Sequence, residues 1–224
     1  MNETIKQIID LEWEMFHNVN GEDRVGCQDE RPTFTLMRNA QFSAWDDATT
    51  ASYLEDLKDA VANGRSLVRE KYIRMMECSD PVGYEKFKVD LPTDSEEKKQ
   101  LVEDIWQIML AQTEKIREKY PILALGGRPL HASEEKGWPS VETYQKGELF
   151  TYSENTLKSL LAHAKALEAQ GISLAYNIQE NSVLCLGYKT MQQAEMAMAG
   201  QLMAEMGITL DTGDCPTCHI PDEQ

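Results

Sequence analysis

The chain has 224 residues, of which 42% are hydrophobic and 27% are charged, a composition typical of a globular protein with a sizeable core. Its formal net charge of −16 repels a phosphate backbone, and because no basic stripe offsets this charge we expect no nucleic-acid binding. No segment reaches the ~20 apolar residues of a membrane span, and the first residues carry acids where a signal peptide has a basic start. We therefore expect no membrane contact and a cytoplasmic protein with reduced thiols.

Apolar side chains recur at helical spacing along most of the chain, and no stretch alternates as a strand would. The predicted helices, in chain order, cover residues 2–19, about 32–63 with a break near Asp46-Asp47, 66–77, a short helix after Asp80-Pro81, one that follows a capping box at Thr93-x-x-Glu96 and runs to Lys119, and about 140–150, 153–170, 173–186 and 190–206. The sequence thus predicts an all-α fold, a compact multi-helix bundle. We expect one domain over residues 1–210 and a flexible tail over 211–224.

A shift of 107 residues aligns parts of the first half of the chain with the second. Gly64-x-Ser66-Leu67, for example, aligns with Gly171-x-Ser173-Leu174. Amphipathic helices joined by a glycine turn also match in part by chance, so two interpretations stay open. An internal duplication predicts two similar halves, about residues 1–92 and 93–207, packed around a pseudo-two-fold axis in a closed bundle.

Seven stretches carry a family resemblance. They are EWEMF (12–16), CQDE (27–30), TLMRNAQFSAW (35–45), GRSLVREKYIRMME (64–77), GGRPLHAS (126–133), ETYQKGELFTYSE (142–154) and GYKTMQQAE (187–195). In these stretches the chain resembles a bacterial and archaeal family catalogued only as domain of unknown function 4125. The resemblance covers most of residues 5–195 and implies kinship and a cytoplasmic location, with no activity, cofactor or catalytic residue.

Two motifs suggest metal or haem chemistry, and each also has a plainer interpretation. Cys215-x-x-Cys218-His219 has the spacing of covalent haem attachment, but that chemistry normally happens outside the cytoplasm. A redox pair needs a following helix and a metal site needs further ligands, so we interpret the motif as part of a mobile tail, with adventitious metal binding as the alternative. Glu14-x-x-His17 is half of a di-iron motif without a second copy. We therefore predict no metal site, and the sequence names no cofactor.

Two irregular loops are candidates for a functional site. The first holds Cys27 and Asp29, a thiol and an acid just before a helix start. The second holds Arg128, which can clamp a carboxylate or phosphate, and His131, which can transfer protons near neutral pH. Structural roles remain open for both, since Arg128 can pair with acids and His131 can cap a helix.

The helices that follow these loops each present polar and aromatic residues at helical spacing. Arg38, Gln41 and Trp45 share one face, and Glu148 and Tyr152 share the equivalent face 107 residues later. The two faces predict either a central pocket or a solvent-facing stripe.

Two functions follow as hypotheses, and whether the protein is an enzyme stays open. In the first, the protein binds a small polar or anionic molecule between its halves through Arg38 and Arg128, with Gln41, Trp45, Asp29 and Tyr152 as further lining. His131 and Glu148 are then the acid-base candidates, and Cys27 is a nucleophile if a base lies within reach. In the second, the protein is a non-catalytic interaction module that uses its acidic surface and the methionine-rich helix 190–206 to bind a protein partner or a second copy of itself. The alternative interpretation of helix 190–206 is that it packs in the core of the protein.

Overall fold

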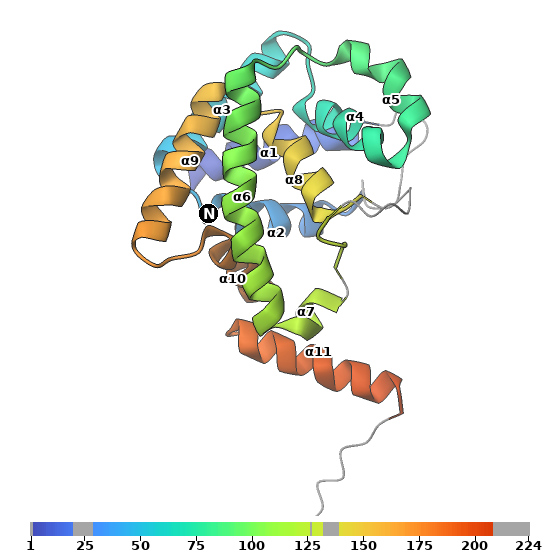
Figure 1. The fold of residues 1–224 in the computed structure, drawn as a ribbon, viewed down its shortest axis with the longest axis vertical. Coiled ribbons are helices and arrows are strands. Elements are labelled where there is room, and N and C mark those ends of the chain that lie inside the picture. Colours follow the sequence, from blue (N-terminus) through green and yellow to red (C-terminus); the bar gives the residue numbers. More distant parts are fainter. Residues whose placement is uncertain (1, 20–28, 126, 132–138, 208–224) are drawn as a thin grey trace, which may run out of the picture.

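The computed structural model of the chain describes residues 2–19, 29–125, 127–131 and 139–207, and the regular elements in these ranges are all helices (Figure 1). They are α1 (Glu3–His17), α2 (Arg31–Phe42), α3 (Asp47–Ala62), α4 (Leu67–Ser79), α5 (Pro81–Phe87), the 3₁₀-helix η2 (Lys88–Asp90), α6 (Glu96–Lys119), α7 (Pro121–Leu125), α8 (Val141–Leu149), α9 (Glu154–Ala169), α10 (Leu174–Cys185) and α11 (Met191–Glu205). The predicted all-α class is confirmed. The predicted tail over 211–224, with Cys215, Cys218 and His219, lies outside the described residues.

Most helices begin at a residue whose short polar side chain accepts a backbone N–H from the first turn. Asp46 does so for Thr49 at the start of α3, and the break predicted near this residue separates α2 from α3. The capping box predicted at Thr93 was wrong, because the side chain that caps α6 belongs to Ser95, which accepts from the backbone of Lys98. A serine one position before the first helical residue has the right reach for this bond, whereas a threonine two residues earlier does not.

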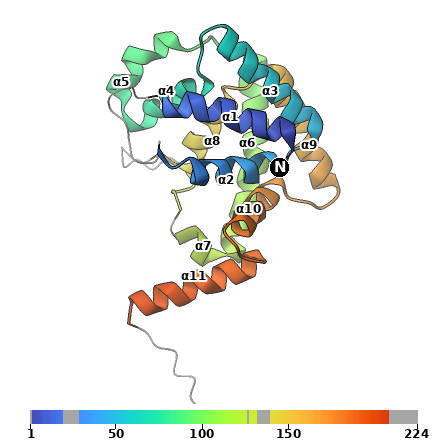
Figure 2. The same ribbon diagram turned by 180° about the vertical axis from the view of Figure 1, so that it is seen from behind.

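The core forms where α1, α3, α6 and α9 pack together, with α2, α4, α8 and α10 around them. In Figure 1, α6 runs along the long axis of the molecule, and in Figure 2 α1 and α2 lie side by side on the opposite face. Leu57, Trp106 and Leu157 are among the side chains with almost no exposure to solvent. Burial of such apolar surface is the main contribution to the stability of the bundle.

The 107-residue offset reappears in the bounds of the helices. α3 begins at Asp47 and α9 at Glu154, α4 begins at Leu67 and α10 at Leu174, and α2 and α8 end at residues 42 and 149. The packing is crossed, since α4 packs on α8 while α10 packs on α2. Gly64 and Gly171 follow the ends of α3 and α9 with φ of 66° and 74°, a backbone region that glycine adopts without strain.

The methionine-rich helix α11 packs on the rest of the molecule through its first turn. Met191 and Ala194 are fully buried there, and Glu195 accepts hydrogen bonds from the backbone N–H groups of Ile122 and Leu123 in α7. Met196, further along the helix, and Met206, directly after its end, are each 66% exposed. Of the two alternatives given for this helix, core packing thus describes its first turn, and the rest projects from the body of the molecule (Figure 1).

Candidate functional site

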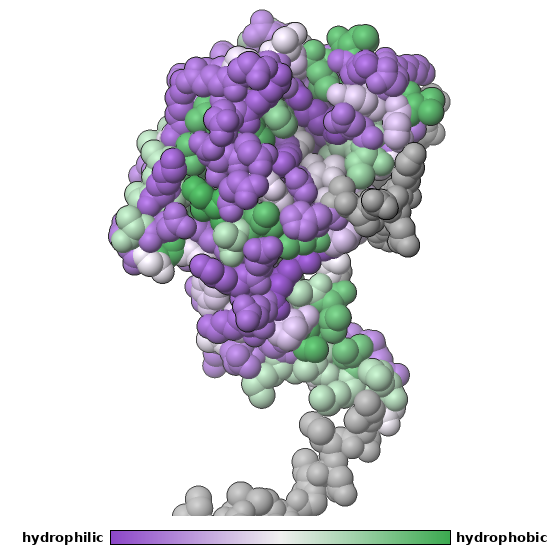
Figure 3. Space-filling view, viewed as in Figure 1, coloured by the Kyte–Doolittle hydropathy of each residue, from purple (hydrophilic) through white to green (hydrophobic). Residues whose placement is uncertain are grey.

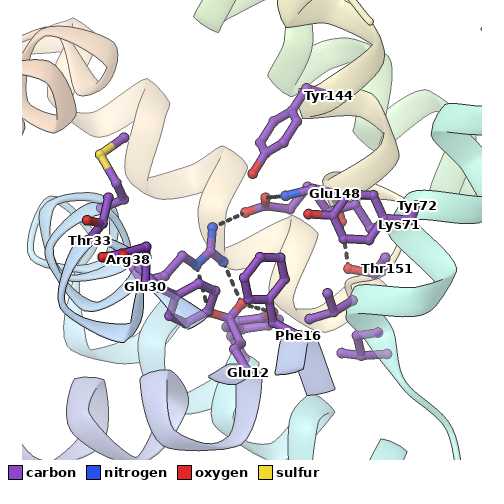
Figure 4. Close-up of a pocket in the computed structure, with 15 residues that line it drawn as sticks. Glu12, Phe16, Glu30, Thr33, Arg38, Lys71, Tyr72, Tyr144, Glu148 and Thr151 are labelled. Carbon is purple, nitrogen blue, oxygen red and sulfur yellow. Dashed lines mark hydrogen bonds and ion pairs between the residues drawn. The ribbon is translucent and has the colours of Figure 1, made fainter. Parts of the chain in front are cut away.

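A cluster of buried charges lies where α1, α2, α4 and α8 meet. Arg38 in α2 donates from Nε and Nη2 to both carboxylate oxygens of Glu12 in α1, with an Nε–oxygen distance of 2.6 Å. Its Nη1 donates to Glu148 in α8 at 3.0 Å. Lys71 in α4 donates to the other oxygen of Glu148 at 2.6 Å. All four side chains are buried, so two carboxylates and two cations neutralise one another inside the protein (Figure 4).

Polar side chains complete the hydrogen bonding of the two carboxylates. The Tyr53 hydroxyl donates to Glu12 and the Tyr152 hydroxyl donates to Glu148, each at 2.7 Å. The Gln41 amide donates to Glu148 at 2.8 Å and accepts from Arg38. A buried ion pair offsets its desolvation only when such further bonds satisfy it, and this cluster meets that condition.

The cluster holds Glu148, Lys71 and Arg38 in their charged forms. Burial alone would raise the pKa of the Glu148 carboxyl, but the charges of Arg38 and Lys71 outweigh this effect and hold the pKa well below its usual range. Burial lowers the pKa of Lys71, yet the Glu148 charge raises it above its ordinary value. Burial, together with the nearby carboxylates, raises the pKa of Tyr53 and of Tyr152. At neutral pH Glu148 is therefore ionised, and in this arrangement it is a weak proton acceptor.

A cavity of about 230 Å³ opens onto this cluster, and we call it the charged cavity. Glu12, Arg38, Lys71 and Glu148 line it. Its other walls are largely aromatic, and the rings that line it belong to Phe16, Phe34, Tyr53, Tyr72 and Tyr144 (Figure 4). The ammonium of Lys71 lies 3.5 Å from the centre of the Tyr144 ring, close enough for a cation–π contact.

A second cavity, of about 440 Å³, is also lined by Glu148, and we call it the amide cavity. Three glutamines contribute to its wall, namely Gln41, Gln145 and Gln179, together with four aromatic rings of Trp45, Tyr120, Tyr144 and Tyr152 and two basic residues, Arg117 and Arg128. Its volume is in the range of roughly 300–1,000 Å³ that is common for small-molecule sites. Met37, Tyr144 and Glu148 line both cavities.

The residues predicted as site residues divide between these cavities and the surface. Arg38 lines the charged cavity, Glu148 lines both, and the amide cavity includes Gln41, Trp45, Arg128 and Tyr152. Trp45 lies just after the end of α2, in the turn that leads to α3, and its ring is 5.7 Å from that of Tyr152.

The remaining predicted residues do not line either cavity. Asp29 is exposed. His131 accepts or donates a hydrogen bond at 3.1 Å with Glu142, and its side chain is 55% exposed. Cys27 lies outside the described residues.

Three important residues were missed from the sequence, namely Glu12, Tyr53 and Lys71. For Glu12 a signal existed, since it falls on the same helical face as Ile5, Ile8 and Ile9, where a charge is buried only with a partner. Lys71 follows the buried Leu67 by four residues and gives the same signal. Tyr53 gives none, because a tyrosine on an apolar face is ordinary core.

The described residues were also searched for a metal site and for a membrane-spanning helix. Within the ranges given above, no group of three or more His, Cys, Asp or Glu side chains is placed to hold a metal ion. No helix in the same ranges is long and apolar enough to span a membrane.

One comparison with known proteins gives a family. A family model described as "Protein of unknown function (DUF4125)" matches residues 2–196, which include α1 to α10 and the residues of both cavities. No curated protein and no solved structure matches the chain. The match spans most of the chain, and the protein therefore belongs to the DUF4125 family.

Proposed function

We propose that the protein binds a small polar or anionic molecule in the amide cavity. The observation that carries this proposal is that Gln41, Trp45, Arg128, Glu148 and Tyr152, which come from distant parts of the chain, line one cavity of about 440 Å³. A concave site with aromatic walls and a few converging polar groups is the usual form of a small-molecule site.

The charges around this cavity favour an anionic group. Its charged lining residues are Arg117, Arg128 and Glu148, and the charge of Glu148 is already balanced by Arg38 and Lys71. Two guanidinium groups are thus left in the wall of the cavity, in a protein whose net charge is −16. Guanidinium groups bind carboxylates and phosphates in a bidentate way, so we expect the ligand to place its anionic group against Arg117 and Arg128.

Polar groups in the wall are available to fix the rest of the ligand. Among the described residues, the amides of Gln145 and Gln179 and the indole N–H of Trp45 make no hydrogen bond with another side chain or with the backbone. Each amide offers donors and an acceptor. A polar molecule that reaches these groups gains specificity, because an analogue without its polar edge leaves them without partners.

We infer further that the site lies between two halves related by an internal duplication. The inference is supported by the matching bounds of α3 and α9 and of α4 and α10, and by the crossed packing of α2 on α10 and α4 on α8. Equivalent faces of the two halves then supply opposite walls of one binding region. We place the protein in the cytoplasm, which cell fractionation with an antibody against the chain tests.

The proposal is tested by the melting temperature of the purified protein in a library of small polar and anionic metabolites. A ligand that binds only the folded state raises this temperature. We expect a hit whose shift is lost in Gln145→Leu and Arg128→Ala but kept in Arg69→Ala, which removes a surface arginine that pairs with Asp90. A library without hits, or hits that all three variants retain, contradicts the proposal. Whether the bound molecule is converted is then read from its recovery after incubation.

A second candidate function is protein interaction through α11. Hydrophobic residues gather where α7 and α11 meet (Figure 3), and Leu125, Met196 and Met206 are each more than 60% exposed. An apolar surface of this kind is a candidate contact for a second copy of the chain. Light scattering on the full chain tests it: a dimer that Met196→Lys converts to a monomer supports the contact, and a monomer at high protein concentration contradicts it.

A further inference from the structure

The charged cavity and the amide cavity are built from positions that the 107-residue offset relates. Four pairs of lining residues from α4 and α10 are separated by 107 residues, and in each pair the α4 residue lines the charged cavity and the α10 residue lines the amide cavity. The pairs are Leu67 and Leu174, Val68 and Ala175, Lys71 and Ile178, and Tyr72 and Gln179. A similar wall therefore occurs twice, with the charged Lys71 in one cavity and the neutral Ile178 at the corresponding position of the other.

The charges differ at three of the corresponding positions. Arg38 and Lys71 of the charged cavity correspond to Gln145 and Ile178 of the amide cavity, and Glu148 corresponds to Gln41. The two cavities thus present different chemistry in similar surroundings. A ligand of the charged cavity must suit paired charges, which the amide cavity does not require.

We propose that the charged cavity is a separate binding site for a small zwitterion that carries neighbouring ammonium and carboxylate groups, as an α-amino acid does. The first argument is hydrogen-bonding capacity at the Lys71–Glu148 ion pair. An ammonium has three donors, and among the described residues Lys71 uses one of them in a hydrogen bond, to Glu148, while the ammonium also contacts the face of the Tyr144 ring. The carboxylate oxygen of Glu148 that accepts this bond accepts no other from the described residues, whereas its second oxygen accepts three.

The Lys71–Glu148 ion pair thus has donors and a lone pair to spare, and a zwitterion can place its own opposite charges against them. Its carboxylate accepts from the spare donors of Lys71, and its ammonium donates to the free lone pair of Glu148. The result is a closed arrangement of four alternating charges. Charge-assisted hydrogen bonds of this kind are about twice as strong as neutral ones.

The buried charges of the cavity select against simple ions. Glu12 and Glu148 balance Arg38 and Lys71, so the buried side chains of the lining have no net charge, and one further carboxylate, that of Glu30, lies at an exposed position of the lining. A ligand with a single net charge would leave an uncompensated charge in a buried place, which is costly. A ligand with both charges adds no net charge and avoids this cost.

The walls and the size indicate the rest of the ligand. The rings of Phe16 and Phe34 stack with their centres 5.1 Å apart, and the Tyr72 ring is 6.4 Å from that of Phe16. All three rings line the cavity, and Figure 4 shows those of Phe16 and Tyr72 close to the ion pairs. The volume of about 230 Å³ corresponds to roughly eight water molecules at ~30 Å³ each. An amino acid with an apolar or aromatic side chain suits both features.

The test is calorimetric titration of the full chain with the L-α-amino acids, each compared with its decarboxylated amine and its N-acetyl derivative. We expect at least one apolar or aromatic amino acid to bind, and the amine and the N-acetyl acid with the same side chain to bind at least tenfold more weakly. Equal binding of either derivative, or no binding by any amino acid, overturns the proposal.

Two variants locate the site without relying on one substitution. Lys71→Met removes the ammonium, and Thr33→Trp fills the cavity from an exposed position on its rim. We expect each to weaken amino-acid binding at least tenfold, and Gln145→Leu in the amide cavity to leave it unchanged. Binding that survives Thr33→Trp, or that is lost in Gln145→Leu, contradicts the proposal. Because Gln145→Leu removes binding only in the amide cavity, failure of this proposal and failure of the proposed function are told apart.

Discussion

Gln41 donates a hydrogen bond of 2.8 Å to Glu148, and the two residues are separated by 107 positions, the same offset that relates the starts of α3 and α9. Trp45 and Tyr152 are also separated by 107 positions, and their rings are in contact, with ring centres 5.7 Å apart. In the duplication that we propose, corresponding residues touch each other only close to the axis that relates the halves. The buried charges and both cavities would then lie along the line where the corresponding helices face one another.

The first prediction concerns the charge of Glu148. Glu148→Gln keeps the size of the side chain but leaves Arg38 and Lys71 with one carboxylate fewer, so we expect the free energy of unfolding at pH 7 to fall by about 3–5 kcal/mol. Urea denaturation measures it. Glu55→Gln is the control, since Glu55 is exposed and pairs with Lys58 on the surface, and we expect no change there. Equal stability of the two variants would show that the buried pairs contribute little.

The second prediction concerns acid. The pKa of Glu148 is lower in the folded chain than the ~4.3 of an unfolded one, so the unfolded state binds more protons as the pH falls. The stability that this carboxylate contributes is complete above about pH 5 and is lost progressively below it. The urea midpoint of the wild type, measured from pH 7 to pH 3, should thus fall more steeply than that of Glu148→Gln. If the urea midpoints of the two proteins fell equally with pH, the lowered pKa of Glu148 in the folded chain would be contradicted.

The third prediction compares glycines. Gly64 and Gly171 have positive φ, whereas Gly200 lies inside α11, where no atom comes within 4 Å of the place that a methyl group would take. Alanine at Gly64 or Gly171 should each cost about 1–2 kcal/mol. Alanine at Gly200 should instead stabilise the chain by about 0.5–1 kcal/mol. Thermal or urea unfolding of the three variants measures this, and a loss at Gly200 equal to that at Gly64 would contradict the backbone argument.

The fourth prediction concerns the C-terminal residues. A chain that ends at Leu210 should keep the melting temperature of the full chain, because the removed residues are polar and offer little apolar surface to bury. Metal analysis of the full chain and of Cys215→Ser and Cys218→Ser completes the test. Stoichiometric metal or haem that is lost on substitution would move the functional site to this segment.

The sequence predicted most of the helices well because their signals are local. The period of the apolar residues and the capping side chains locate them to within a few residues, including the break before Asp47. The short helix α7 was not predicted, since five residues after Tyr120 are too few to show a helical period.

The site was predicted less completely because it depends on contacts between distant elements. The polar face of Arg38 and Gln41 was visible in the sequence, and so was that of Glu148. No local pattern, however, indicated that Glu12 and Lys71 would neutralise Arg38 and Glu148 from two other helices. His131 looked like a catalytic residue in the sequence, yet it lies on the surface beside Glu142.

The measurement that tests the proposed function most directly is the nuclear magnetic resonance signal of the Trp45 indole N–H. The chain has four tryptophans, and Trp45→Phe identifies the signal that belongs to the amide cavity. We predict that a hit from the metabolite library shifts this signal in proportion to occupancy, leaves that of Trp13 in place, and needs at least tenfold more ligand in Arg128→Ala. Hits that raise the melting temperature without moving the Trp45 signal would contradict binding in the amide cavity.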